Sequence, residues 1–175
     1  MIARRVQALA TETRGAAIIE LALIAPIFAT MVIGVVDMSN AYSRKLALEQ
    51  GAQRAIEKIM QTTADDTVEA TLKTEVACQV NGTNTDGTCK TSPITAGNVT
   101  VTYSLECTSS GGAITIQTTT DADTFDTYTC SGSPEVRYIQ VGVTDQYTPM
   151  FPVHFSAINS DGTYHLSATA GMRIQ

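Results

Sequence analysis

The sequence has little of what enzymes and nucleic-acid-binding proteins use. It contains two histidines, His154 and His165, and neither lies in a nucleophile elbow or a metal-binding motif. No glycine-rich phosphate loop follows a predicted strand, so we expect no catalytic set and no cofactor. Lysine and arginine number 11 against 17 aspartates and glutamates, and the formal net charge of -6 argues against nucleic acid as a partner. These shortages predict a non-enzymatic protein.

What the sequence does have is one long apolar run. Residues 16–36 contain a single charged residue, Glu20. About 20 mostly apolar residues suffice to cross a hydrocarbon core of about 30 Å, so the run predicts a transmembrane helix. A cleaved secretory signal is the alternative interpretation. The run is longer than the apolar region of such a signal, no good small-x-small site ends it, and the helical pattern continues beyond it.

The charges around this run predict its orientation. Arg4, Arg5 and Arg14 precede the run, whereas Asp37 follows it directly. Because positively charged flanks stay in the cytoplasm, we expect the N-terminus there and everything after Val36 outside. The chain is then a single-pass membrane protein in contact with lipid.

Two residues within the run are unusual for a simple anchor. A carboxylate deep in a bilayer costs at least about 2.5 to 3.5 kcal/mol on insertion scales, so Glu20 marks a functional position. Pro26 removes one backbone donor and predicts a kink in the helix. Prolines are also tolerated in membrane helices without a special role.

The organisation predicted after the run is a helix that continues into water and then a small head. We expect a leader at 1–15, the membrane segment at 16–36, an amphipathic extension of the helix at 37–60 and an exported α+β head at 61–175. In the extension, apolar residues recur near helical spacing, and charged residues occupy the remaining surface. The apolar residues are Ala41, Leu46, Leu48, Ala52, Ala55, Ile56 and Ile59, and the charged ones are Arg44, Lys45, Glu49, Arg54, Glu57 and Lys58.

The head is predicted to combine a second helix with an antiparallel sheet. Residues 62–66 break the first helix and offer caps for the second, whose apolar stripe is Val68, Leu72 and Val76. Strand-like alternation follows at 99–105 and 114–117, with Gly111-Gly112 as the turn of a hairpin. Tyr128, residues 136–143 and residues 164–174 complete four or five strands, which gives an α+β class with a modest core.

Four cysteines all follow the membrane run, which favours disulfides in an exported domain. Three pairings are possible. We favour Cys78 with Cys89, which closes a short loop, and Cys107 with Cys130, which ties two strand-like segments. Zinc is the other interpretation, but no C-x-x-C pair is present.

Weaker patterns concern a metal and glycosylation. Asp121, Asp123 and Asp126 could crowd around calcium, although the glycine and distal glutamate of an EF-hand loop are missing, and a solvated acidic turn is the alternative. Asn81 and Asn98 each begin a glycosylation sequon, and we interpret both as turns or strand starts.

The stretch RGAAIIELALIAP, from Arg14 to Pro26, resembles the opening of the TadE-like proteins, which are pilin-related subunits of tight-adherence (Tad/Flp) pili. The resemblance extends to residues 34–37 and 48–56, and it includes the closing stretches 148–152 and 166–170. The major pilins of these filaments are very short and favour tyrosine after the glutamate. Leu21 and the large head therefore point to a minor pilin or pseudopilin.

The resemblance implies how the chain is processed and assembled. A prepilin peptidase would cut after Gly15 on the cytoplasmic side, and Ala16 would carry the new amine. That amine on a neighbouring subunit would neutralise Glu20 and set the offset between helices. The implied partners are the peptidase, other pilins of the same machinery and inner-membrane lipid, with the head in the periplasm or the cell exterior.

The resemblance further implies a role in pilus biogenesis, initiation or tip assembly of a bacterial type IVc pilus, and thereby in adhesion. A different class of function stays open beside it. In that alternative the chain is an unprocessed, single-pass envelope protein whose exported head binds a ligand or a surface.

Overall fold

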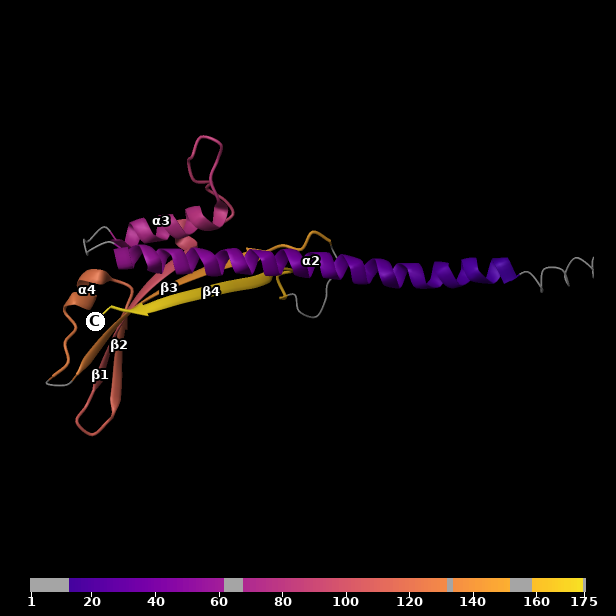
Figure 1. The fold of residues 1–175 in the computed structure, drawn as a ribbon. Coiled ribbons are helices and arrows are strands. Elements are labelled where there is room, and N and C mark those ends of the chain that lie inside the picture. The colour runs from indigo at the N-terminus through magenta and orange to yellow at the C-terminus, as the bar shows by residue number, and fades with distance from the viewer. Residues whose placement is uncertain (1–12, 62–67, 132–133, 152–158, 175) are drawn as a thin grey trace, which may run out of the picture.

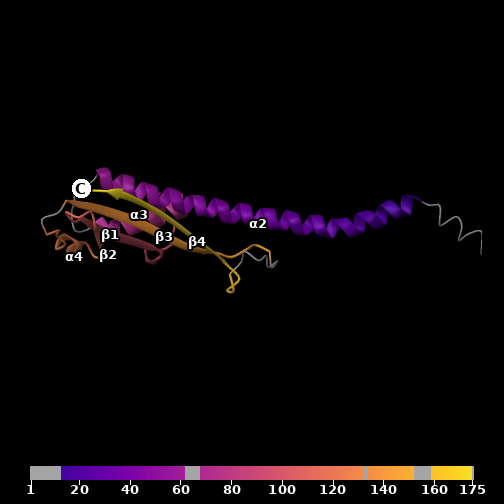
Figure 2. The same cartoon turned by 90° about the horizontal axis from the view of Figure 1, so that it is seen from below.

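A computed structural model describes residues 13–61, 68–131, 134–151 and 159–174, and it has the predicted α+β class. One long helix carries a small head at its C-terminal half, as Figures 1 and 2 show. The elements in chain order are α2 (Thr13–Gln61), α3 (Val68–Asn81), the 3-10 helix η1 (Ala96–Asn98), β1 (Val99–Thr108), β2 (Ile114–Thr119), α4 (Ala122–Asp126), β3 (Glu135–Tyr147) and β4 (Tyr164–Arg173).

Helix α2 is the axis of the molecule. Its 49 residues correspond to a length of roughly 73 Å at 1.5 Å per residue. The helix continues through Pro26, and Figure 2 shows a bend in its N-terminal half. In Figure 1 the head lies along the C-terminal half of α2, while the N-terminal half extends beyond every other element drawn as helix or strand. The predicted passage of the apolar run into a longer helix is confirmed.

The four strands form one antiparallel sheet in the order β2-β1-β3-β4. Strands β1 and β2 make the predicted hairpin, and Gly112 in its turn has a φ of 81°, which glycine adopts without strain. Strand β3 then pairs with the other side of β1, with Leu105 opposite Arg137. Strand β4 continues beyond it, with Ala170 opposite Val141.

One face of this sheet packs under the helices and holds the core. Alternate residues of β1 and β3 point to that face, while threonine, serine and glutamine occupy much of the other. The strands contribute Val99, Val101, Tyr103, Leu105, Ile139, Val141 and Val143. Helix α2 contributes Leu48, Ala52, Ala55 and Ile56, and α3 contributes Leu72, Val76, Ala77 and Val80. The outer half of α2 is therefore built into the core of the head.

Two predicted details differ in the structure. Tyr128 does not belong to a strand, because it follows the short helix α4, where its amide donates to the carbonyl of Phe125 at 3.0 Å. Leu46 does not face the core, and its side chain is exposed. The predicted helix break at 62–66 lies outside the described residues.

Candidate functional site

The N-terminal half of α2 presents its apolar side chains without cover from the rest of the described chain. An 18-residue window of the helix has a mean hydropathy of 2.4, and none of it is buried. By length and composition, α2 is the one helix among the described residues that could cross a membrane. This half of the helix is compatible with a membrane anchor. Its exposed large apolar residues are Ile18, Ile19, Leu21, Leu23, Ile24, Ile27, Phe28, Met31, Val32, Val35 and Val36.

The predicted processing site lies at the start of this half. The backbone of Gly15 and Ala16 belongs to the first turns of α2, and the side chain of Ala16 lies outside the described part. Glu20 is exposed on the same helix, and within the described residues its carboxylate has neither a hydrogen bond nor an ion pair. A carboxylate in this apolar setting is costly to place in a bilayer.

Glu20 lies on a face of α2 that continues as an apolar stripe beyond the membrane run. Eighteen residues make five full turns, so Met38 lies directly above Glu20 along an ideal helix. Tyr42 and Leu46 follow at helical spacing on this side. Met38, Tyr42 and Leu46 are 55%, 62% and 39% exposed, although they belong to the half of the helix that carries the head. We call these three residues the exposed stripe.

The face of α2 that meets the head begins at Asp37. Only 1% of this residue is exposed, which is rare for an aspartate. Its carboxylate accepts hydrogen bonds from the backbone amides of Met150 and Phe151 at 2.9 and 3.3 Å. Asn40 adds a donor to the Met150 sulfur at 3.4 Å. The segment after β3 is thus fixed to the helix where the apolar run ends.

Sequence reasoning treated Asp37 only as a charge beside the membrane run and missed this contact. Its partners are more than 100 positions away and are backbone amides, which leave no residue-type signal. One local feature did indicate burial: Asp37 is one helical turn before Ala41, so it lies on the helix face that was predicted to be buried.

Arg44 is a second polar residue on the covered face. The sequence pattern placed it on the solvated surface, and the structure corrects this. Its Nε atom donates to Asp145 of β3 at 2.7 Å, and the two side chains are 20% and 9% exposed. Asp145 also accepts from the amide of Gln146 at 2.9 Å. Breaking a charge-assisted pair with so little solvent leaves a partly buried charge without its partner, so the pair constrains how the head lies against α2.

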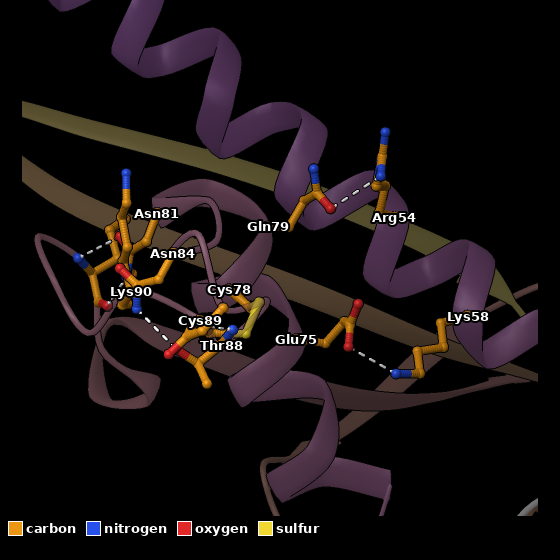
Figure 3. Close-up of a disulfide and its surroundings, with 12 residues drawn as sticks. Arg54, Lys58, Glu75, Cys78, Gln79, Asn81, Asn84, Thr88, Cys89 and Lys90 are labelled. Atoms are coloured by element: carbon orange, nitrogen blue, oxygen red, sulfur yellow. Dashed lines mark hydrogen bonds and ion pairs between the residues drawn. A yellow bond between two sulfur atoms is a disulfide. The ribbon is translucent and has the colours of Figure 1, made fainter.

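Figure 3 shows the first disulfide and the contacts between α3 and α2. Cys78 is bonded to Cys89, as favoured from the sequence, and the bond closes the loop that follows α3. On the side of α3 toward α2, Lys58 donates to Glu75 at 2.8 Å. Arg54 donates to Gln79 at 3.0 Å. These partly exposed bonds frame the apolar contact between the two helices.

Asn81 ends α3 and holds the far end of the same loop. Its amide group donates to the carbonyls of Lys90 and Ile94 at 2.9 and 2.6 Å, and its amide oxygen accepts from the Ile94 amide at 3.0 Å. Because both ends of the side-chain amide are engaged, this asparagine is structural. Asn98 lies in η1, where its side-chain oxygen accepts from the amide and hydroxyl of Thr95, at the predicted start of a strand.

The second disulfide joins Cys107 of β1 to Cys130, which is the other favoured pair. It holds the segment that contains α4, a short helix that sequence reasoning did not predict. Phe125 of α4 is buried, and its ring lies 5.3 Å from that of Tyr103 and 5.0 Å from the guanidinium of Arg137. Burial, followed by the nearby acids Glu69, Asp126 and Asp121, raises the pKa of Tyr103 to about 12.

Of the aspartates considered for calcium, Asp121 directly precedes α4, and Asp123 and Asp126 lie within it. Asp121 caps this helix by accepting the amide of Thr124 at 2.6 Å, and hydrogen bonds from Thr124 lower the pKa of Asp121. No group of three or more potential metal-ligating side chains gathers in the described portions of the chain. The observed role of Asp121 is that of a helix cap.

Of the two histidines, His165 is described and His154 lies outside the described residues. His165 lies 2.6 Å from the Asp161 carboxylate at the start of β4. Hydrogen bonds from His165 and then from Thr163 lower the pKa of Asp161 to about 2. Since Asp161 also accepts the amide and hydroxyl of Thr163, the pair stabilises a turn.

A bare apolar helix half with a lone carboxylate, together with a disulfide-bonded head, makes an α+β protein with one anchor-like helix. Residues 15–56 match the family model described as TadE-like protein. No curated protein and no solved structure shows a significant match to the chain. The resemblance drawn from the sequence is confirmed over the matched segment, which is 42 of the 175 residues.

The matched segment contains Gly15, Glu20, the exposed stripe and Asp37, and it ends within the part of α2 that joins the core. Family resemblance therefore covers the membrane run and its continuation. Most of the head lies outside it.

Proposed function

We propose that this chain is a minor pilin or pseudopilin of a bacterial Tad pilus. A prepilin peptidase cuts it after Gly15, and the processed subunit acts in pilus initiation, biogenesis or tip assembly, which supports adhesion. The observation that carries this proposal is the alignment of Glu20 with the exposed stripe on one side of α2.

The alignment supports assembly because it offers a neighbour one continuous packing face. Within the apolar run, Glu20 requires a partner such as the new amine of a neighbouring Ala16. Above the run, Met38, Tyr42 and Leu46 are exposed where a solitary subunit would place polar residues. Packing a neighbouring helix on this face satisfies both needs at once.

Intact-mass measurement of the membrane-extracted protein tests the processing step. A chain that begins at Ala16 supports the proposal. A chain that retains Arg4 and Arg5 contradicts it and favours the unprocessed envelope anchor. Gly15→Ala should block the cut, whereas Glu20→Ala should leave the cut intact and impair pilus assembly.

The exposed stripe offers a test that is independent of the cut. Tyr42→Ser should reduce incorporation into pili while leaving processing and the fold of the head unchanged, because Tyr42 faces away from the core. Ser43→Ala is the matched control, since it changes the next exposed residue off the stripe. Equal incorporation of both variants would argue against the stripe as a packing surface.

A further inference from the structure

The segment that Asp37 holds against α2 carries exposed apolar side chains. Met150 is 69% exposed and Phe151 is 37% exposed, and the backbone amides of these same two residues donate to Asp37. Two hydrogen bonds from backbone amides to one buried carboxylate fix the position of this backbone along the helix axis. The hydrogen bond from Asn40 to the Met150 sulfur adds a third attachment. These hydrogen bonds therefore hold the two exposed side chains at a defined position beside α2.

The position of this attachment is informative. Asp37 is the first charged residue after the apolar run, and the contacts with Asp37 and Asn40 place Met150 and Phe151 beside the first turn that follows this run. Figure 1 shows the connection that leaves β3 running along α2 toward its bare half. The head thus presents apolar side chains at the level where the helix would leave the hydrocarbon core.

We propose that this segment rests on the surface of the lipid bilayer, with Met150 and Phe151 in the interfacial layer. The inference requires that α2 is a membrane anchor, which is part of the proposed function, but it does not require processing at Gly15. Aromatic and apolar side chains are favourable at the boundary between lipid headgroups and acyl chains, because there they are removed from water.

Two observations favour lipid over a neighbouring subunit as the occupant. The Asp37 face of α2 and the exposed stripe point in different directions, since one residue along a helix turns it by about 100°. A helix packed on Met38 and Tyr42 would therefore not cover Met150. In addition, the sequence contains no aspartate, glutamate, lysine or arginine between Asp145 and Asp161, so approach to a membrane surface desolvates no charge there.

The chain contains no tryptophan, which makes a direct test possible. The variant Phe151→Trp has a single tryptophan in the full-length protein, whose emission is followed after selective excitation. The protein is reconstituted at one copy per nanodisc in phosphatidylcholine brominated on its acyl chains. Ile116→Trp is the control, because Ile116 is also an exposed apolar residue but lies on the outer face of the sheet, on β2. We expect Trp emission at position 151 to be blue-shifted and quenched several-fold more strongly than at position 116.

Adding Asp37→Ala to the Phe151→Trp variant should reduce the quenching toward the control value. Retention of both disulfides and of the helical circular dichroism shows that this variant is folded. Hydrogen exchange at the amides of Met150 and Phe151, which should become faster, measures the loss of the attachment separately.

Other results would overturn the inference. Weak quenching at both positions would show that the segment stays in water, and a blue shift without quenching would show that it packs against protein. Equal quenching at both positions would show that the head lies on lipid without a specific contact. Failure to enter nanodiscs would overturn the anchor as well, whereas an uncut chain with the expected quenching would refute only the proposed processing.

Discussion

Single polar residues decide how the head is fixed to its helix. Asp37 and Arg44 lie two turns apart on the covered face of α2, and both bind the sheet or the segment that follows it. Neither belongs to the apolar pattern that identifies a helix. Apolar burial places the sheet against α2, and these polar contacts determine its position along the helix.

Asp145→Asn should destabilise the head by about 2 kcal/mol, because it leaves the Arg44 charge partly buried without its anion. Glu49→Gln is the matched control. It removes the exposed pair with Lys45, in which the atoms are 3.9 Å apart, and should cost less than about 0.5 kcal/mol. Urea unfolding of the detergent-solubilised protein measures both changes. A similar loss of unfolding free energy in the two variants would mean that the partly buried Arg44 pair contributes no more to stability than the exposed Lys45 pair.

Gly51 sets the closeness of α2 and α3. A Cβ at this position would lie 2.6 Å from Cγ2 of Val80 and 3.4 Å from the carbonyl oxygen of Val76. Overpacking typically costs about 1 to 3 kcal/mol, whereas alanine gains up to about 1 kcal/mol over glycine in a helix. We therefore expect Gly51→Ala to destabilise the protein by about 1 kcal/mol.

The Val80→Ala background provides the control for this prediction. With the valine methyl groups removed, Gly51→Ala should become neutral or stabilising, because only the gain in helix propensity is left. Unfolding free energies of the unchanged protein, the two single variants and the double variant test the contact. The same cost of Gly51→Ala in both backgrounds would show that Val80 does not limit the helix approach.

The elements of the head were predictable where a short-range pattern defines them. Alternation along β1 and β2 and the double glycine predicted the hairpin, and the apolar spacing of α3 predicted its buried side. Both favoured disulfides are present, one favoured because it closes a short loop and the other because it ties two strand-like segments. Helix α4 was not predicted, because five residues are too few to show a helical period.

The candidate site was predictable only in part for a related reason. Glu20 and Gly15 stand out because a charge and a cleavage-like motif are local features of the sequence. The burial of Asp37 depends on amides more than 100 residues away, and the orientation of Leu46 depends on which side of α2 the sheet occupies. Such facts arise from tertiary packing, which periodicity along one helix does not specify.

The two disulfides should contribute differently, although loop entropy alone assigns each about 3 kcal/mol. Replacing Cys107 and Cys130 by serine frees the segment that carries the buried Phe125, so we expect a loss near that full amount. Replacing Cys78 and Cys89 should cost less, because Asn81 still holds the other end of its loop. Denaturant unfolding measures the totals.

Hydrogen exchange gives the matching local measurement. Loss of the Cys78–Cys89 bond should speed exchange within residues 83–89 and leave β1 protected, whereas loss of the Cys107–Cys130 bond should expose α4. The opposite ranking of the two stabilities would show that the loop after α3 contributes more to the fold than the α4 segment.

At the scale of the whole molecule, α2 combines two kinds of surface in one continuous helix. Its first half is apolar on all sides except at Glu20, which is compatible with a helix surrounded by lipid. Its second half has a covered face toward the head and an exposed stripe on another side. The transition falls at Asp37, where the head first attaches. Because α2 is continuous, the position of the apolar half is tied to the position of the head.

This organisation predicts where the chain can be divided. A fragment of residues 37–175 should fold without detergent, because it keeps Asp37, Arg44 and all the core residues that α2 supplies. A fragment of residues 62–175 should not fold, because removing Leu48, Ala52 and Ile56 uncovers the inner face of the sheet and one side of α3. Near-ultraviolet circular dichroism and thermal unfolding of both fragments, oxidised to form the two disulfides, distinguish these outcomes. A cooperative transition in the shorter fragment would mean that α2 only tethers the head, and aggregation of the longer one would mean that the exposed stripe needs a partner before the head is soluble.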